Sequence, residues 1–314
     1  MFLVLLMAAV IAAAQVRVDV RLVNVIATVT DARGRNIPDL TAEDFILEED
    51  GKRQPIMHFS QDQDVPVSIG ILLDTSGSMD RKIRTAVEAV EHFSRQIQEH
   101  DEVFLLTFAN SPVLRQDFTD DRQKLAQALR HVNATGGTAL YDALSDGLKM
   151  IRSGRHNKRA ILVITDGQDT SSTATLDEVL ASVRQSDLLI YPVGISGLSY
   201  AKDFDVFSDL AVAGMVPLKP GRGAQSRRDE VDYRVLRALA ESSGGRAFVL
   251  AESLINRGGQ IERVLDAIAD ELRSQYTLGF YPPRPDDGRF HSLRIRTVSA
   301  NTVRARRGYV AAAP

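Results

Sequence analysis

Three short polar segments contain the residues whose types and spacing could do chemistry. The first, "DTSGS" at Asp74–Ser78, directly follows the apolar run Gly70–Leu73. The second, "TDG" at Thr165–Gly167, follows "RAILVI", and the third is the loop "NATGGTALYD", which contains Thr138. In open parallel sheets, ligands bind beyond the carboxyl ends of the strands, so we expect the three segments to lie together.

These segments offer oxygen atoms as ligands. Alternate positions of an extended loop point to one side, so Asp74, Ser76 and Ser78 can converge, and Gly77 permits the turn between them. Carboxylate and hydroxyl oxygens without nitrogen or sulfur suit a hard cation such as Mg²⁺ or Mn²⁺. Two acids and three hydroxyls barely neutralise a divalent ion and leave it short of ligands. The sequence therefore predicts an open site that water or an external carboxylate completes.

The same segments resemble a known family. "DTSGSM" fits the D-x-S-x-S pattern of von Willebrand factor type A domains. Thr138 of "GGT" and Asp166 of "TDG" follow in the order of the remaining members of that family's metal-ion-dependent adhesion site (MIDAS). The resemblance extends over roughly Pro66 to Arg273, and its three motifs at predicted strand ends make it specific.

The resemblance also implies a role for each residue. The implied metal residues are Asp74, Ser76, Ser78, Thr138 and Asp166. The two serines would bind the ion directly, the threonine directly or through water, and the two aspartates often through water. Asp142, one turn beyond Thr138, is a candidate to orient these ligands by hydrogen bonds without touching the ion itself. The implied ion is Mg²⁺ or Mn²⁺, or Ca²⁺, and a glutamate or aspartate of a bound protein would complete its shell.

Alternating strands and helices are predicted to position these segments. Short aliphatic and β-branched runs predict buried strands at Val67–Leu73, Val103–Ala109, Ala160–Thr165, Leu188–Val193 and Ala247–Leu250. Apolar residues at steps of three to four predict helices at Ile83–Ile97, Leu125–Val132, Leu140–Ile151, Leu176–Val183, Tyr233–Ala240 and Ile255–Leu272. This alternation predicts an α/β fold over residues 65–275, with a doubly wound, mostly parallel Rossmann-like sheet and helices on both faces.

Extended segments flank this unit. Residues 15–64 alternate apolar and polar positions, with a hairpin predicted at Asp50–Gly51, and residues 276–314 return to strands. Neither flank is long enough for a stable sandwich alone, so we expect the two to pair into a small β-sandwich-like domain. With these flanks, the chain resembles bacterial von Willebrand A-related proteins of the kind abundant in acidobacterial genomes.

The first residues, "MFLVLLMAAVIAAAQ", form an apolar run that ends in Ala12–Ala14. The run is too short to span a bilayer as a helix and ends in a small-residue cleavage pattern, which predicts a signal peptide over residues 1–14. No Lys or Arg precedes it, and a buried strand or an uncleaved anchor are the alternatives. We therefore expect export to the periplasm or cell surface, with no membrane span after cleavage.

Composition excludes several classes of function. The net charge of −3 over 314 residues gives no signature of nucleic-acid binding. The absence of cysteine excludes disulfides, thiolate metal sites and cysteine nucleophiles. The six histidines show no metal-ligand spacing, and no G-x-S-x-G motif surrounds Ser76 or Ser78. The basic residues in Lys219–Glu230 and at Arg304, Arg306 and Arg307 are typical of solvated surfaces.

Three functions remain open. The first is a non-enzymatic, metal-dependent module for protein binding or adhesion, whose Thr138 moves inward when a partner binds, with the loop Ser196–Asp232 shaping specificity. The second is a structural or assembly component whose metal only makes the site rigid. The third is an Mg²⁺-dependent phosphatase with Asp74 as nucleophile, although such enzymes usually have a second acid where this chain has Ser76.

Overall fold

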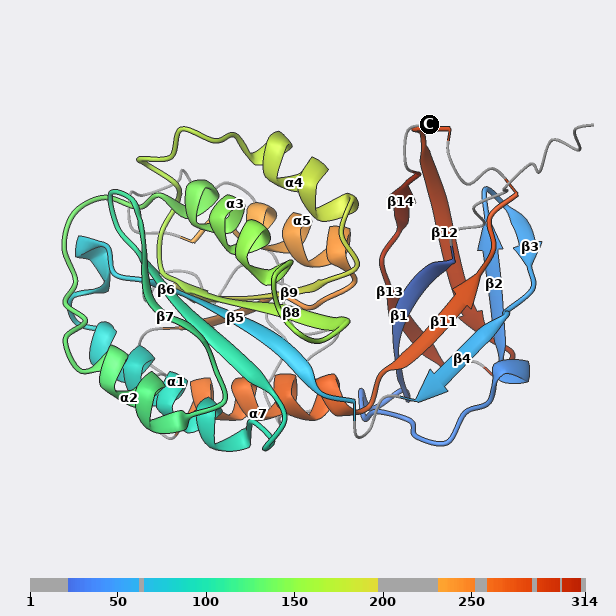
Figure 1. The fold of residues 1–314 in the computed structure, drawn as a ribbon, viewed down its shortest axis with the longest axis horizontal. Helices are drawn as coiled ribbons and strands as arrows, with labels where there is room; N and C mark the ends of the chain where they lie inside the picture. Colours follow the sequence, from blue (N-terminus) through green and yellow to red (C-terminus); the bar gives the residue numbers. More distant parts are fainter. Residues whose placement is uncertain are drawn as a thin grey trace, which may run out of the picture.

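The computed structural model arranges the chain as two units that lie side by side, an α/β unit and a β unit (Figure 1). It describes residues 22–61, 65–196, 231–251, 259–283, 287–299 and 301–311. The predicted signal peptide, the segment Lys219–Glu230 and most of the loop Ser196–Asp232 lie outside these ranges. No helix among the described residues is long and apolar enough to cross a membrane.

The α/β unit is built on a six-stranded sheet with the strand order β10-β9-β8-β5-β6-β7. All neighbouring pairs are parallel except β6 and β7. The strands are β5 (Val67–Asp74), β6 (Glu102–Phe108), β7 (Pro112–Thr119), β8 (Lys158–Thr165), β9 (Leu189–Ser196) and β10 (Phe248–Ala251). Every residue of β5 is buried, because helices cover both faces of the sheet.

Six described α-helices form the two outer layers (Figure 1). On one face lie α1 (Ile83–Gln96), α2 (Arg122–Leu129) and α7 (Gln260–Arg273), whose apolar residues share a core with the sheet. On the other face lie α3 (Leu140–Ile151), α4 (Leu176–Arg184) and α5 (Tyr233–Ser243). The predicted α/β fold class, with a mostly parallel sheet and helices on both faces, is confirmed.

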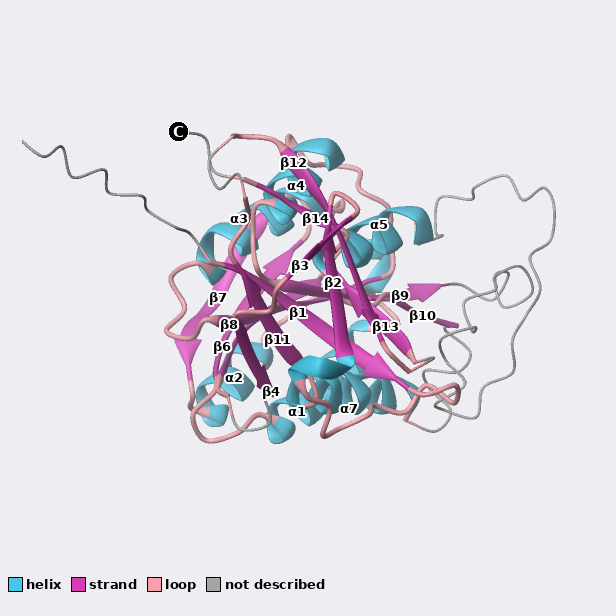
Figure 2. Ribbon diagram, turned by 90° about the vertical axis from the view of Figure 1, so that its right-hand side faces the viewer, coloured by secondary structure: helices cyan, strands magenta, loops and turns pink. Residues whose placement is uncertain are grey.

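The β unit contains two four-stranded antiparallel sheets, with strand orders β13-β1-β11-β4 and β14-β12-β2-β3. Its N-terminal strands are β1 (Val23–Thr30), β2 (Phe45–Glu49), β3 (Lys52–Gln54) and β4 (His58–Gln61). Its C-terminal strands are β11 (Tyr276–Phe280), β12 (Phe290–Thr297), β13 (Thr302–Ala305) and β14 (Gly308–Val310). Strands from both flanks pair within each sheet and together enclose one apolar core, as the predicted fold class requires (Figure 2).

Two local details differ from the sequence prediction. The hairpin turns at Asp50–Gly51, where both residues have positive φ, but the chain after it divides into β3 and β4, which belong to different sheets. Pro55 lies between them and has no N–H to donate to a ladder, which explains the break. The edge strand β7 was not predicted, because its Val113 and Leu114 are exposed and give no buried apolar pattern.

Buried ion pairs and hydrogen bonds join the two units. Arg304 of β13 pairs with Glu271 of α7, a buried carboxylate that also accepts a hydrogen bond of 2.8 Å from Tyr191 of β9. Arg306 pairs with Asp187 at 2.6 Å and donates to the carbonyl oxygen of Ser186 at 3.2 Å. The prediction that these arginines lie on a solvated surface is therefore wrong for Arg306, which is 7% exposed.

Candidate metal centre

The predicted metal residues lie where the strand order of the parallel sheet reverses. After β5 the chain adds β6 on one side, and it later returns to place β8 on the other side of β5. Asp74 ends β5 and Asp166 directly follows β8, so both acids stand at this switch point. A short 3₁₀ turn, Gly77–Met79, follows β5 and carries Ser78.

Hydrogen bonds connect four of the five predicted residues directly. The Ser76 N–H donates to Asp74 Oδ1 at 2.8 Å, and the Ser76 and Ser78 hydroxyls lie 3.0 Å apart. Ser78 Oγ donates to Asp166 Oδ1 at 2.7 Å. On the far side, the Thr165 hydroxyl donates to Asp74 Oδ2 at 2.5 Å, which fixes the orientation of that carboxylate.

The fifth residue, Thr138, faces the same place. A methyl group placed on Gly167 would lie 3.4 Å from the Thr138 hydroxyl and 3.8 Å from that of Ser78. Thr138 comes from a loop that joins the Asp74–Ser78 segment through its backbone, because the Gly77 N–H donates to the Gly136 carbonyl at 3.0 Å. The structure thus brings all five residues to one edge of the sheet.

Most residues of the site are buried, and the site reaches the surface at Ser78. Asp74 and Asp166 are fully buried and Ser76 and Thr138 nearly so, whereas Ser78 is exposed. Burial raises the pKa of Asp74 to about 6, although hydrogen bonds from Ser76 and Thr165 act in the opposite direction. The charged form of this carboxylate is therefore poorly solvated, and a cation beside it would be stabilising.

A buried lysine that sequence reasoning missed also belongs to the site. The ammonium group of Lys82 forms an ion pair with Asp166 Oδ2, and its side chain is 8% exposed. Lys82 precedes α1 and lies four residues after Ser78, but its partner is 84 residues away in the sequence. Only that proximity to Ser78 could have indicated it.

The loop after β8 holds Thr138 in place. The N–H groups of Thr170 and Ser171 donate to the Thr138 carbonyl oxygen at 2.8 and 3.1 Å, and the Thr138 N–H donates to the Thr170 hydroxyl at 2.9 Å. Asp169 caps the start of α3 by accepting the Tyr141 N–H at 3.1 Å. The position of Thr138 is therefore set jointly by this loop and by α3.

Asp142 was predicted to support the metal ligands from behind. Its carboxylate accepts hydrogen bonds from the N–H groups of Thr173 and Ala174, at 2.8 to 3.1 Å, and from the Thr173 hydroxyl, and its support of a metal site stays a prediction. Burial acts to raise the pKa of Asp142, but these bonds outweigh it and lower the pKa below its usual value. Asp142 therefore orders the loop that holds Thr138 and does not hydrogen-bond to the five predicted residues.

The donor set fits a hard divalent cation. It offers two carboxylates and three hydroxyls, all oxygen, and one of the carboxylates is destabilised by burial. No group of three or more His, Cys, Asp or Glu side chains that could hold a metal exists among the described residues. A site that depends on hydroxyl groups is consistent with that finding.

Comparisons with known proteins give a match to a domain family and two distant relatives. Residues 69–168 match the von Willebrand factor type A domain. An uncharacterized protein of Borreliella burgdorferi is 25% identical over 204 residues, which is 62% of this chain and 55% of that protein. An uncharacterized protein of Synechocystis is 26% identical over 112 residues, which is 34% of this chain and 27% of that protein. The chain thus spans about half or less of these curated relatives.

Among solved structures, proximal thread matrix protein 1 from the mussel byssus, with a zinc-occupied MIDAS motif, has a TM-score of 0.50 and 13% identity. That match covers 70% of this chain and 48% of the byssus protein. A von Willebrand factor type A protein from Catenulispora acidiphila has a TM-score of 0.49 and 12% identity, covering 93% of this chain and 74% of its own. At such identities, the likeness to the byssus protein shows a shared fold.

Proposed function

We propose that this protein, which contains a von Willebrand factor type A domain, is a metal-dependent protein-binding or adhesion module that captures a carboxylate of its partner. The observation that carries the proposal is the convergence of buried acids and hydroxyls at the switch point of the sheet. The residues that would hold the ion are Asp74, Ser76, Ser78, Thr138 and Asp166. Mg²⁺ or Mn²⁺ suits these donors, and zinc occupies the MIDAS motif of the byssus protein.

The chain's own residues are suited to this role. Asp74 is oriented by the Ser76 N–H and the Thr165 hydroxyl, so its carboxylate needs no rearrangement. The exposed Ser78 places the opening of the site at the surface, where a side chain of another protein can reach it. A bound divalent cation would supply an electrophile for that side chain's Asp or Glu oxygen. We expect the Thr138 hydroxyl to move inward toward the ion as the partner binds.

We further propose that the protein is not an enzyme and acts outside the cytoplasm. The hydroxyls of Ser76 and Ser78 contact each other, and Ser78 contacts Asp166, so neither is paired with a histidine base. Export rests on the apolar run at residues 1–14. We propose that residues 65–275 form the binding domain, and that residues 15–64 and 276–314 together form the supporting β domain.

Calorimetric titration with Mg²⁺ and Mn²⁺ tests the metal site. We expect saturable binding to the wild-type chain and its loss in Asp74→Ala, with circular dichroism showing an intact fold. Asp80→Ala is the matched control, because Asp80 is an exposed acid only six residues away, and it should keep its affinity within about twofold. Stoichiometric binding that persists in Asp74→Ala would refute the assignment.

Binding of a partner is tested separately. An envelope extract passed over the immobilised protein should yield a captured protein in Mg²⁺ and lose it in chelator, and Thr138→Ala should weaken the capture. Capture undiminished by chelator would leave the metal with a structural role. Metal-dependent hydrolysis of a generic phosphate ester, abolished by Asp74→Ala, would instead favour the phosphatase.

A further inference from the structure

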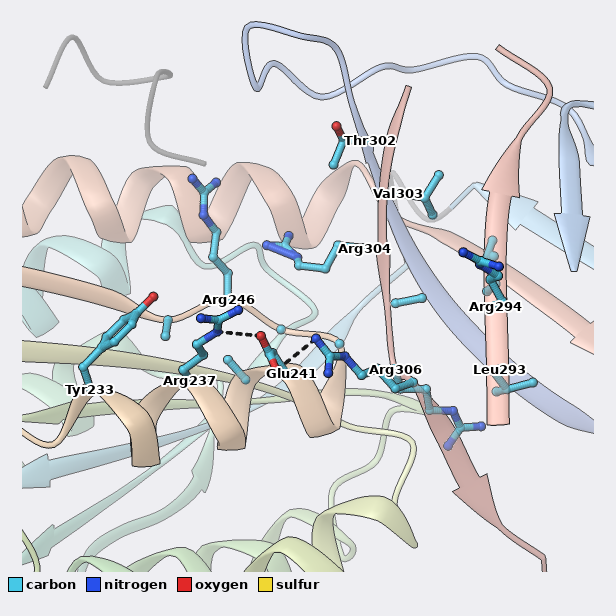
Figure 3. Close-up of a pocket in the computed structure, with 17 residues that line it drawn as sticks. Tyr233, Arg237, Glu241, Arg246, Leu293, Arg294, Thr302, Val303, Arg304 and Arg306 are labelled. Atoms are coloured by element: carbon cyan, nitrogen blue, oxygen red, sulfur yellow. Dashed lines mark hydrogen bonds and ion pairs between the residues drawn. The ribbon is translucent and has the colours of Figure 1, made fainter. Parts of the chain in front are cut away.

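A cavity of about 440 Å³ lies between the two units (Figure 3). Helix α5 and the turn at residues 244–247, just before β10, form one wall, and β12, β13 and the residues after β13 form the other. Its lining includes six arginines and one acid, Glu241. The arginines are Arg237, Arg246, Arg294, Arg304, Arg306 and Arg307. Junctions between units and volumes of this size are common for small-ligand sites.

The lining of this arginine cavity contains more arginines than acids. Glu241 is shared between two guanidinium groups, with Arg237 at 2.7 Å and Arg307 at 3.1 Å. Arg304 and Arg306 each pair with a carboxylate outside the lining, Glu271 and Asp187. Arg246 lies over the ring of Phe248, 5.1 Å from its centre. Figure 3 shows Arg304 extending from β13 toward Arg246, so two guanidinium groups from different units approach one space.

Two of these arginines keep donor capacity that the fold does not use. The Nε atoms of Arg304 and Arg306 are buried and make no hydrogen bond with the described residues. Arg306 is 7% exposed, and its other nitrogens are held by Asp187 and by the carbonyl oxygens of Ser186 and Asn24. A buried donor without an acceptor costs free energy, and an oxyanion that drew either guanidinium group toward the cavity would supply the acceptor.

Part of the backbone that lines the cavity is also held in place before any ligand arrives. Gly244 brings α5 against β13 so closely that a methyl group there would lie 2.6 Å from the Arg306 backbone nitrogen. The planar, permanently charged arginine fork matches the oxygens of phosphate and sulfate better than it matches halide ions. Prior ordering lowers the entropic cost of binding such a ligand.

We propose that the arginine cavity binds a tetrahedral oxyanion, a phosphate or sulfate group, either free or as the ester of a larger compound. The site is separate from the candidate metal centre. Strand β5 begins beside the β unit and ends at Asp74, about 25 Å farther along the sheet. The two sites therefore lie at opposite ends of the parallel strands and can be tested independently.

The test is calorimetric titration of the full chain in chelator, with inorganic phosphate, sulfate and phosphoserine as probes and sodium chloride at matched ionic strength as the blank. The variant is Arg246→Gln with Arg307→Gln, because neither side chain is buried and the fold should survive. The matched control is Arg296→Gln, an exposed arginine of β12 that pairs with Glu48 and does not line the cavity.

We expect saturable binding of at least one probe to the wild-type chain, at least tenfold weaker in the double variant and changed less than twofold in the control. Tighter binding of phosphoserine than of inorganic phosphate would assign the site to phosphate esters, and the reverse to the free anion. Absence of saturable binding by all three probes, or equal weakening in the variant and the control, would overturn the proposal.

Discussion

The two ends of the central sheet both bury charged side chains, but with different partners. At the carboxyl end, Asp74 and Asp166 contact hydroxyl groups and Lys82 of the same unit. At the amino end, Arg304 and Arg306 cross to the neighbouring unit and pair with Glu271 and Asp187. Charges at the amino end fix the two units together, whereas those at the carboxyl end contribute nothing to that junction.

The charges at the amino end therefore stabilise the fold, whereas those at the carboxyl end are suited to binding an ion. Burial raises the pKa of Asp74 to about 6, so its charge is destabilising in the isolated fold and would be relieved by a cation. Asp187, in contrast, is 63% exposed and remains solvated even without its arginine. Buried acids with few cationic partners are the arrangement expected of a site that completes itself with an ion.

The largest expected effect tests this difference at Lys82. Lys82→Met would leave Asp166 buried without its cation, and we expect a loss of about 3 kcal/mol in the free energy of unfolding measured in chelator. Saturating Mg²⁺ should restore much of that loss, because the ion replaces the missing positive charge. Urea unfolding with and without Mg²⁺ measures both quantities.

Arg306→Met is the comparison at the other end. It removes hydrogen bonds to the carbonyl oxygens of Ser186 and Asn24, so it should also destabilise the chain, but Mg²⁺ should not relieve the loss. Equal rescue of both variants by Mg²⁺ would mean that the ion does not act at the carboxyl end.

A smaller loss of stability is expected at Gly244, where the end of α5 lies close to the backbone of Arg306. Gly244 has φ of +86°, and a methyl group there would meet the Arg306 backbone nitrogen at 2.6 Å. Gly51 has φ of +75°, but no atom lies within 4 Å of the corresponding methyl position. Gly51→Ala should therefore cost about 1 kcal/mol from backbone strain alone, and Gly244→Ala about 2 to 3 kcal/mol.

Thermal or urea unfolding of the two glycine variants provides the measurement. Gly244→Ala should also weaken the contact between the units, which limited proteolysis can detect. Equal losses in the two variants would show that the backbone at Gly244 and Arg306 can move apart at little cost. The close approach of the two units there would then not fix the position of Arg306.

The sequence predicted helices and strands best where the spacing of apolar residues matches their burial in the structure. The run Val67–Leu73 predicted β5, and Leu140–Ile151 predicted the bounds of α3, because both present regular apolar patterns. The five candidate metal residues were found because each stands at a strand end or a glycine-rich turn. That they bind a metal stays a prediction.

Features that depend on contacts between distant residues were missed. Lys82 has no local signal for its pairing with Asp166. Asp142 was assigned by its distance from Thr138 along a helix, which does not show that its carboxylate accepts hydrogen bonds from a loop. Arg306 lies in a run of alternating charge that is typical of a solvated strand, and only the packing of the two units buries it. Local pattern determines the elements, whereas these side chains depend on tertiary contacts.

The smallest expected effect lies in the β unit, away from both ends of the sheet. His291 is 6% exposed and contacts Asp50 at 2.8 Å and Asp287 at 3.0 Å, with its ring stacked on Tyr309. Burial acts to lower the pKa of His291, but the two carboxylates outweigh it and raise the pKa above 6.5. A raised pKa means that the charged form stabilises the fold, so this contribution is complete below pH 6.5 and is lost as the pH rises through the folded value.

Unfolding midpoints measured in chelator from pH 5 to 9 test this contribution, with His291→Gln as the variant. The wild-type chain should lose stability above pH 6.5, and the variant should show a flatter profile there because glutamine does not titrate. The raised pKa of Asp74 acts in another window, since its cost develops as the pH rises from 3.8 to about 6 and is constant above. Asp74→Asn should therefore alter the profile only below pH 6. A profile above pH 6.5 that is identical in His291→Gln and the wild-type chain would contradict the role of this histidine.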